Sequence, residues 1–192
     1  MIKTLLTLAM MTSSALAVNL AIKLELTENA KKVINSILDK GTLDETTKKK
    51  LVKTPHITIG YIENIDSEKT AKKIFNSAKN FLEKELEENS FDYYVEEMAI
   101  KFDSHTVLAP TKNTEKNLKK LNGKLEEYVN NLGYKFNKFT TNDNYTPHIT
   151  LINGTVGPNR LKSMNKEIDK IKEKKNGNLF FKIDSIGSGI KK

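Results

Sequence analysis

The chain of 192 residues contains no cysteine and no tryptophan, and Arg160 is its single arginine. Without cysteine there can be no disulfide, no thiolate nucleophile and no cysteine-ligated zinc. The longest apolar run near the start, Leu5 to Met11, is too short to cross a membrane. These absences exclude thiol chemistry and predict no membrane span.

The composition is that of an ordinary globular protein. Hydrophobic residues make up 38% of the chain and charged residues 29%, which fits one compact domain or two small lobes that share a core. The net charge of +8 is compatible with a polyanionic ligand such as RNA. Because lysine supplies nearly all of this charge and arginine is the better bidentate phosphate ligand, the support is modest.

The first residues match the pattern of a secretory signal peptide. Lys3 gives a positive start, the apolar run follows, and Ala15-Leu16-Ala17 has the small-residue form of a cleavage site. We therefore expect a signal peptide at residues 1–17, a single domain at 18–192, and a secreted or periplasmic protein. The alternatives are that this stretch is the first strand of the fold or an anchor that stays attached.

A six-residue phrase occurs twice in the chain. Thr-Pro-His-Ile-Thr-Ile at 54–59 returns as Thr-Pro-His-Ile-Thr-Leu at 146–151, with five of six positions identical. His56 and His148 thus hold equivalent places in the two copies, and the chain has only three histidines. The repeated pair is the first place to look for chemistry.

Each copy has the pattern of a half-buried strand. Alternate side chains of a strand point to opposite faces, so His56 and Thr58 share one face, as do His148 and Thr150. Histidine titrates near neutral pH, so one imidazole can accept a proton while the other donates one. The threonine hydroxyls can donate hydrogen bonds to phosphoryl oxygens. The pattern indicates metal-free cleavage of phosphodiesters, although a duplicated structural strand with incidental histidines remains an alternative.

These paired His-x-Thr-aliphatic motifs resemble those of the two-histidine (2H) phosphoesterase superfamily, of the RNA ligase-like, cyclic phosphodiesterase type. The resemblance covers about everything after the first twenty residues. It implies an α+β, bilobal fold in which two pseudo-symmetric sheet-plus-helix lobes flank a central cleft, with one motif in each lobe. It also implies hydrolysis or ligation of phosphodiesters at a 2′ or 2′,3′-cyclic end, without metal or other cofactor.

Residues around the motifs are weaker candidates. We expect Tyr61 and Tyr145 to contact a nucleotide, and Lys138 and Phe139 to line the same pocket. Four lysines precede the first motif, at positions 48, 49, 50 and 53, but charge runs are more often solvated faces. His105 lies beside a predicted turn and has no repeated context, which is typical of a surface or hydrogen-bonded histidine.

Apolar periodicity predicts alternating strands and helices. Strands are expected at 19–26, 55–62, 147–152 and 179–186, with a hairpin over 91–109 split at 103–104. Helices are expected at 27–39, 66–89, 111–132 and 159–175, with a short turn at 44–51. Thr27 and Ser67 or Asp66 are expected N-caps, as is Thr111 or Thr114, and Gly41 and Gly133 are expected stops.

Three functions compete. The first is a monomeric phosphodiesterase that acts on RNA, oligonucleotide or cyclic nucleotide ends, with His56 and His148 as acid and base in an order the sequence leaves open. The second is a non-catalytic nucleotide- or RNA-binding module of the same fold. The third is a histidine metal site, which the lack of cysteine and of any His-x-His pair disfavours.

Overall fold

The computed structural model describes residues 17–89, 91–102 and 104–191. The predicted signal peptide therefore lies almost wholly outside the described residues. The elements alternate largely as expected, and their bounds are β1 Val18–Leu26, α1 Glu28–Lys40, α2 Glu45–Lys48, β2 His56–Ile65, α3 Glu68–Glu88, β3 Asp92–Lys101, β4 His105–Pro110, α4 Lys112–Asn131, β5 Ile149–Ile152, α5 Pro158–Lys174 and β6 Phe180–Lys191.

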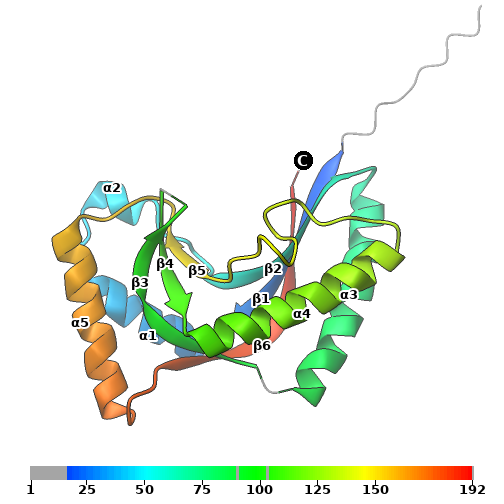
Figure 1. Ribbon diagram of the computed structural model, residues 1–192. Helices are drawn as coiled ribbons and strands as arrows, with labels where there is room; N and C mark the ends of the chain where they lie inside the picture. Colours follow the sequence, from blue (N-terminus) through cyan, green and yellow to red (C-terminus); the bar gives the residue numbers. More distant parts are fainter. Residues whose placement is uncertain (1–16, 90, 103, 192) are drawn as a thin grey trace, which may run out of the picture.

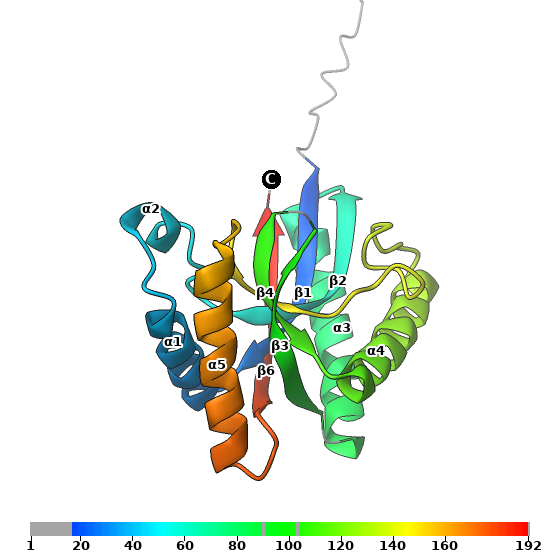
Figure 2. The same cartoon turned by 60° about the vertical axis from the view of Figure 1, so that its left-hand side comes forward.

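The six described strands are antiparallel, and their hydrogen bonds follow the closed order β1-β2-β5-β4-β3-β6. The two motif strands, β2 and β5, are direct neighbours in this order although 83 residues separate the end of the one from the start of the other (149 minus 65, less one). Figure 1 shows α1, α2 and α5 on one side of the strands and α3 and α4 on the other. Figure 2 shows the same division from a second direction. The α+β class is confirmed.

Strand β1 shows how the sequence sets the two faces of the sheet. Its alternate residues Val18, Leu20, Ile22, Leu24 and Leu26 are all buried, whereas the residues between them are half-buried. Buried side chains of α3, such as Ile74 and Leu82, belong to the same core cluster. Burying each large aliphatic side chain contributes about 1.5–3 kcal/mol, which fixes the register of the strand. The half-buried face is left for function.

The helices begin where side chains can accept hydrogen bonds from free backbone N–H groups. Thr27, Ser67 and Thr111 cap α1, α3 and α4, and Gly41 ends α1, as the sequence predicts. Gly133, with φ of +88°, follows the end of α4. Among the described residues, no helix is both long and apolar enough to span a membrane.

Three strands differ in length from the prediction. The first motif strand, expected to end at 62, continues to Ile65. The last strand, expected to end at 186, continues to Lys191 because it pairs with β1 from Leu26 to Asn19. The second motif strand begins at Ile149 and not at Pro147. Pro147 has no N–H to donate to a neighbouring strand, and it lies buried just before β5.

Candidate active site

The register of β2 and β5 brings the two motifs together. Ile57 lies opposite Ile149 in the antiparallel pair, and both side chains are fully buried. One residue to either side, His56 therefore faces Thr150 and His148 faces Thr58, all on the less buried face. Opposite Cβ atoms in such pairs lie about 4.5–5.5 Å apart and diagonal ones about 7–8 Å. We call these four residues the His/Thr square; the imidazoles occupy its diagonal corners.

Both imidazoles are held in the same way. Nδ1 of His56 lies 2.8 Å from the carbonyl oxygen of Thr54, and Nδ1 of His148 lies 2.8 Å from that of Thr146. A carbonyl oxygen can only accept, so Nδ1 carries the hydrogen in each ring. In the neutral form Nε2 is then the unprotonated nitrogen. The Thr-Pro-His phrase thus sets the tautomer that a general base needs, in both copies.

Burial lowers the pKa of both imidazoles below the ordinary histidine value, and the hydrogen bond to the backbone carbonyl opposes this in each case. Lys23 and His148 lower the pKa of His56 further, while the nearby Glu25 raises it. His105 and Lys101 lower the pKa of His148. Because burial, the largest influence, lowers the pKa of each ring below the ordinary histidine value, both rings favour the neutral form near pH 7 without a ligand.

The threonine hydroxyls of the square are available. Within the described residues, neither the Thr58 nor the Thr150 side chain makes a hydrogen bond, although both are half-buried. The backbone oxygen of Thr58 is used, since it accepts a hydrogen bond from the Tyr145 hydroxyl at 3.0 Å. The two hydroxyls can therefore donate to an incoming oxyanion without breaking an existing bond.

A cavity of about 510 Å³ opens beside the square. Its lining includes Thr58, His148 and Thr150 but not His56. Aromatic and amide side chains complete it: Tyr61, Phe102, Asn137, Phe139, Asn144 and Tyr145, with Glu63, His105, Thr140 and Thr146. A mostly apolar hollow with a few polar groups is the usual form of a small-ligand site.

Two exposed phenylalanines stand at this cavity. Phe102 is 53% exposed, and its ring centroid lies 4.8 Å from that of His148. Its φ of +54° belongs to the left-handed region, which is unusual for a bulky side chain. Phe139 is 70% exposed, and the ammonium group of Lys138 lies 4.9 Å from its ring centroid. Apolar rings left in solvent beside a cavity indicate a surface on which a ligand can stack.

The segment before the second motif is fastened to the first motif strand. Gly60 of β2 lies against Phe136, and a Cβ at this glycine would collide with the ring. Asn122, fully buried in α4, donates from Nδ2 to the carbonyl oxygens of Ile59, at 2.7 Å, and Thr140, at 2.9 Å. These contacts hold the wall of the cavity in a fixed position relative to the square.

The weaker candidate residues differ in how far they are exposed to the cavity. Tyr61, Phe139 and Tyr145 all line the cavity, but Tyr145 is only 3% exposed, so just an edge of its ring is open to a ligand. His105, which its sequence context marks as ordinary, lines the cavity as well, and its Nδ1 lies 2.9 Å from Ser104 Oγ. Phe102 has no sequence signal at all, because a phenylalanine in a turn usually means nothing.

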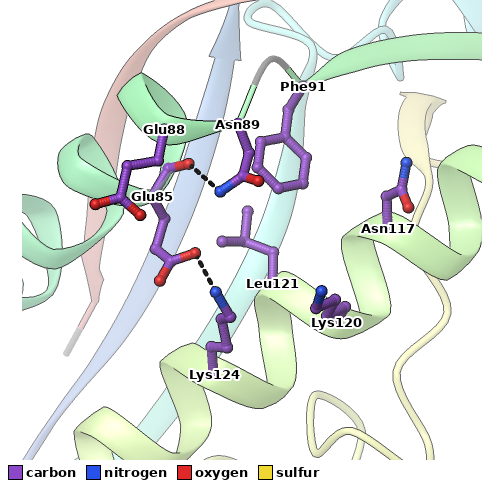
Figure 3. Close-up of a pocket in the computed structure, with 8 residues that line it drawn as sticks. All are labelled: Glu85, Glu88, Asn89, Phe91, Asn117, Lys120, Leu121 and Lys124. Carbon is purple, nitrogen blue, oxygen red and sulfur yellow. Dashed lines mark hydrogen bonds and ion pairs between the residues drawn. The ribbon is translucent and has the colours of Figure 1, made fainter.

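A second cavity, of about 390 Å³, lies between α3 and α4 and contains no histidine (Figure 3). Lys124 pairs with Glu85 across it at 2.6 Å, and Asn89 donates to the backbone oxygen of Glu85. These polar groups already satisfy one another. Among the described residues, no three acidic or histidine side chains gather in a way that could hold a metal ion.

Paired strands with two imidazoles and two hydroxyls on one face agree with the resemblance to two-histidine phosphoesterases. Residues 15–185 match the family described as the AKAP7 2′5′ RNA ligase-like domain. The chain belongs to this family of 2H phosphoesterases.

Solved structures share the fold at low sequence identity. The MHV ns2 PDE domain is 12% identical, with a TM-score of 0.55 over 91% of this chain and 99% of that one. LigT of E. coli, in complex with NADP+, is 16% identical, with a TM-score of 0.51 over 73% and 76%. ATU0111 of Agrobacterium tumefaciens, a conserved protein of unknown function, is 16% identical, with a TM-score of 0.51 over 92% and 82%. No curated protein matches the chain.

Proposed function

We propose that the protein is a metal-independent phosphodiesterase that acts on 2′,3′-cyclic or 2′–5′-linked ends of RNA or nucleotides. The observation that carries the proposal is the register Ile57 to Ile149, which sets the two motifs side by side with their histidines and threonines on one face. The 2H family and the fold support the same reaction class.

The reaction would run as follows for a cyclic phosphate. One neutral imidazole takes a proton from water at Nε2 while the water oxygen bonds to phosphorus. The bond from phosphorus to the ribose 2′ or 3′ oxygen breaks, and the other imidazole, protonated, gives its Nε2 proton to that leaving oxygen. Thr58 and Thr150 donate hydrogen bonds to the non-bridging oxygens, where negative charge accumulates. Either histidine can serve as the acid.

The bound substrate raises the pKa of the imidazole that acts as the acid. Both imidazoles favour the neutral form in the free protein, but the acid must be protonated. A phosphate anion within a few ångströms raises the pKa of an adjacent imidazole. Binding therefore creates the acid at the place and time at which it is needed, while the second ring, once the first is charged, is held neutral by repulsion.

The two-lobe arrangement belongs to this proposal. We place one motif strand in each lobe and the reacting phosphate in the groove between them. The two groups of helices on either side of the strands support this division (Figure 1). In the same proposal, the nucleobase occupies the 510 Å³ cavity and stacks on Phe102, Phe139 or Tyr61. The NADP+ complex of LigT, which shares the fold, supports a nucleotide as ligand.

We also propose that the protein is exported after cleavage behind Ala17 and acts as a monomer. The charged, apolar and small-residue segments of the first 17 residues support export. The N-terminal sequence of the protein recovered from its native source should begin at Val18. Recovery of the intact N-terminus inside the cell would contradict export.

A product-resolved assay tests the function. Purified protein, in EDTA, is given a 2′,3′-cyclic dinucleotide, a 2′–5′ dinucleotide and a 3′–5′ dinucleotide, and the products are separated by chromatography. We expect turnover of one of the first two by the wild type and its loss in His56→Ala. Tight binding with no turnover would support the non-catalytic module, and activity lost in EDTA and restored by zinc would support a metal site.

A further inference from the structure

The His/Thr square continues sideways onto β1 and β6. Lys23 of β1 lies opposite Thr58 on one side and opposite Gly187 of β6 on the other. In the next row, Ala21 lies opposite Tyr61 and Gly189. Side chains directly opposite one another share a face of the sheet, so Lys23 stands on the same face as the square.

The side chain of Lys23 has a definite place. A Cβ built at Gly189 would stand 3.0 Å from Lys23 Nζ, so the ammonium group lies above that glycine. A Cβ built at Gly187 would collide with Glu25 Oε1, so the carboxylate of Glu25 lies above the neighbouring glycine. These two glycines leave room for both long side chains to lie across β6.

The ammonium group of Lys23 has no partner in the part of the chain that the structure describes. Within residues 17–89, 91–102 and 104–191, Lys23 makes neither an ion pair nor a side-chain hydrogen bond, although it is half-buried. The nearest acid along its own strand is Glu25, but Gly187 and Gly189, above which the two groups lie, are two residues apart, or about 6.6 Å at 3.3 Å per residue. A half-buried cation without a partner, beside a site for anions, fits a further anionic group of the ligand.

The distance from the Lys23 ammonium group to the His/Thr square indicates which anionic group of the ligand it would bind. The strand β6 lies two strands from β2, or about 9.6 Å at 4.8 Å per strand, and the square extends beyond β2 toward β5. The ammonium group above Gly189 is thus on the order of 10 Å from a phosphate held within the square, which is too far for direct contact. In the strand register Gly189 is level with Tyr61, and it lies on the β1 side of β2, away from β5. A substrate that extends from the square across β1 would bring a second phosphate to Lys23.

We propose that Lys23 binds a second phosphate of the substrate, next to the reacting one, and that the protein is thereby selective for substrates with two or more phosphates over mononucleoside cyclic phosphates. This inference rests on the proposed phosphodiesterase function. Glu25, the charged group closest along β1, keeps the local positive charge small, so that binding depends on Lys23 itself. Lys191 of β6, opposite Asn19, is the next cation on the same strand face.

A matched pair of substrates tests the inference: a nucleoside 2′,3′-cyclic phosphate and the same compound with a 5′-phosphate, which differ by one phosphate only. We expect the wild type to turn over the 5′-phosphorylated compound with a kcat/KM about tenfold higher or more, the usual worth of a charge-assisted hydrogen bond. Lys23→Met should remove this preference through KM, while its kcat on the compound with one phosphate stays within about threefold. Lys23→Arg should keep the preference.

A lysine on the far side of the sheet provides the control. Lys73 is exposed on α3, which packs on the buried face of β1, so Lys73→Met removes the same charge without touching the site. This variant should behave as the wild type does. The inference is wrong if Lys23→Met keeps the preference for the second phosphate, or if it lowers activity on both compounds equally. If the wild type turns over neither compound, nor any cyclic or 2′–5′ dinucleotide, the proposed function itself fails.

Discussion

The two copies of the repeated six-residue motif hold their histidines in the same way, but different residues surround the two histidines. In both, Pro precedes a histidine whose Nδ1 lies 2.8 Å from the backbone oxygen two residues before it. Beyond that, His148 borders the aromatic cavity and lies against Phe102, whereas His56 does not line the cavity and has Lys23 and Glu25 nearby. The motif fixes the tautomer of each imidazole, whereas residues outside the motif determine what lies beside each ring.

This difference suggests that the regions beside the two histidines bind different parts of the substrate. We propose that the cavity beside His148 takes the base and that Lys23, on the β1 side of the square, takes a phosphate. The reacting phosphate would lie between them, on the pseudo-symmetric square. The following predictions test where the two sides are equivalent and where they are not.

The largest effect should come from the imidazoles, for which the two sides should be equivalent. His56→Ala and His148→Ala should each lower kcat about 10²- to 10⁴-fold, the usual worth of one general acid or base. Because the two rings act on one phosphate, the double variant should lose little more than the worse single variant. Steady-state kinetics measure the loss, and circular dichroism checks that the variants fold. Losses that multiply would mean two independent sites.

The hydroxyls should come next and should also be equivalent. Thr58→Val and Thr150→Val preserve shape and remove a donor to the phosphoryl oxygens. We expect a fall in kcat of about 100-fold for each, at the lower end for a lost oxyanion donor. Thr58→Ser, which keeps the hydroxyl, should recover most of the rate. A valine variant as active as the serine variant would remove the hydroxyls from the mechanism.

Removing an aromatic ring of the cavity should affect binding of the base and leave the reaction at the phosphate largely unchanged. Phe139→Ala should raise KM about tenfold for substrates with a base, at the lower end of what one stacked base contributes, and should change kcat less. Phe139 is exposed, so stability should not change. A substrate analogue without a base should not distinguish this variant from the wild type. An equal loss for both substrates would mean that Phe139 does not contact the base.

Tyr145 should act mainly on the position of the first motif. Tyr145→Phe removes the hydrogen bond to the Thr58 oxygen, which should lower the free energy of unfolding by about 1 kcal/mol. The rate should fall by less than tenfold, because the ring itself stays in place. Chemical denaturation and kinetics measure the two effects. A variant with unchanged stability and a large rise in KM would instead indicate that Tyr145 contacts the nucleotide directly.

The smallest effect should be the dependence of stability on pH. Burial lowers the pKa of His56 and His148 in the folded protein, so folding favours their neutral forms. The resulting stability is fully present above pH 6.5 and is lost as the pH falls from 6.5 through the lowered pKa values. Thermal unfolding between pH 7.5 and 5 should show this fall, and it should be shallower in His56→Gln and in His148→Gln. An unchanged slope in both variants would show that neither ring is desolvated.

Much of this arrangement can be predicted from the sequence. The alternation of Ile57 and Ile149 with polar neighbours predicts which face holds the histidines, and the N-caps Thr27 and Ser67 predict where helices begin. These are local signals, because each depends only on residues that are close together in the sequence. The repeated phrase adds the expectation that its two copies share one site.

The remainder depends on contacts between distant segments. The register that places Ile57 opposite Ile149 follows from the packing of the whole sheet, and no local pattern specifies it. Phe102 becomes part of the cavity only because the turn between β3 and β4 ends beside His148. Lys23 has nothing in its own neighbourhood to distinguish it from the other lysines of this lysine-rich chain, until its strand pairs with Thr58 and Gly187.

The central claim is that His56 and His148 contact the same phosphate. Nuclear magnetic resonance of the 15N-labelled imidazoles, assigned with the single histidine variants, tests it during a titration with a nucleoside 2′-monophosphate. We predict that both Nε2 resonances shift along one binding curve, with a single Kd, and that the pKa of at least one ring rises on binding. Resonances that respond with different affinities, or a response from only one of the two rings, would contradict the account.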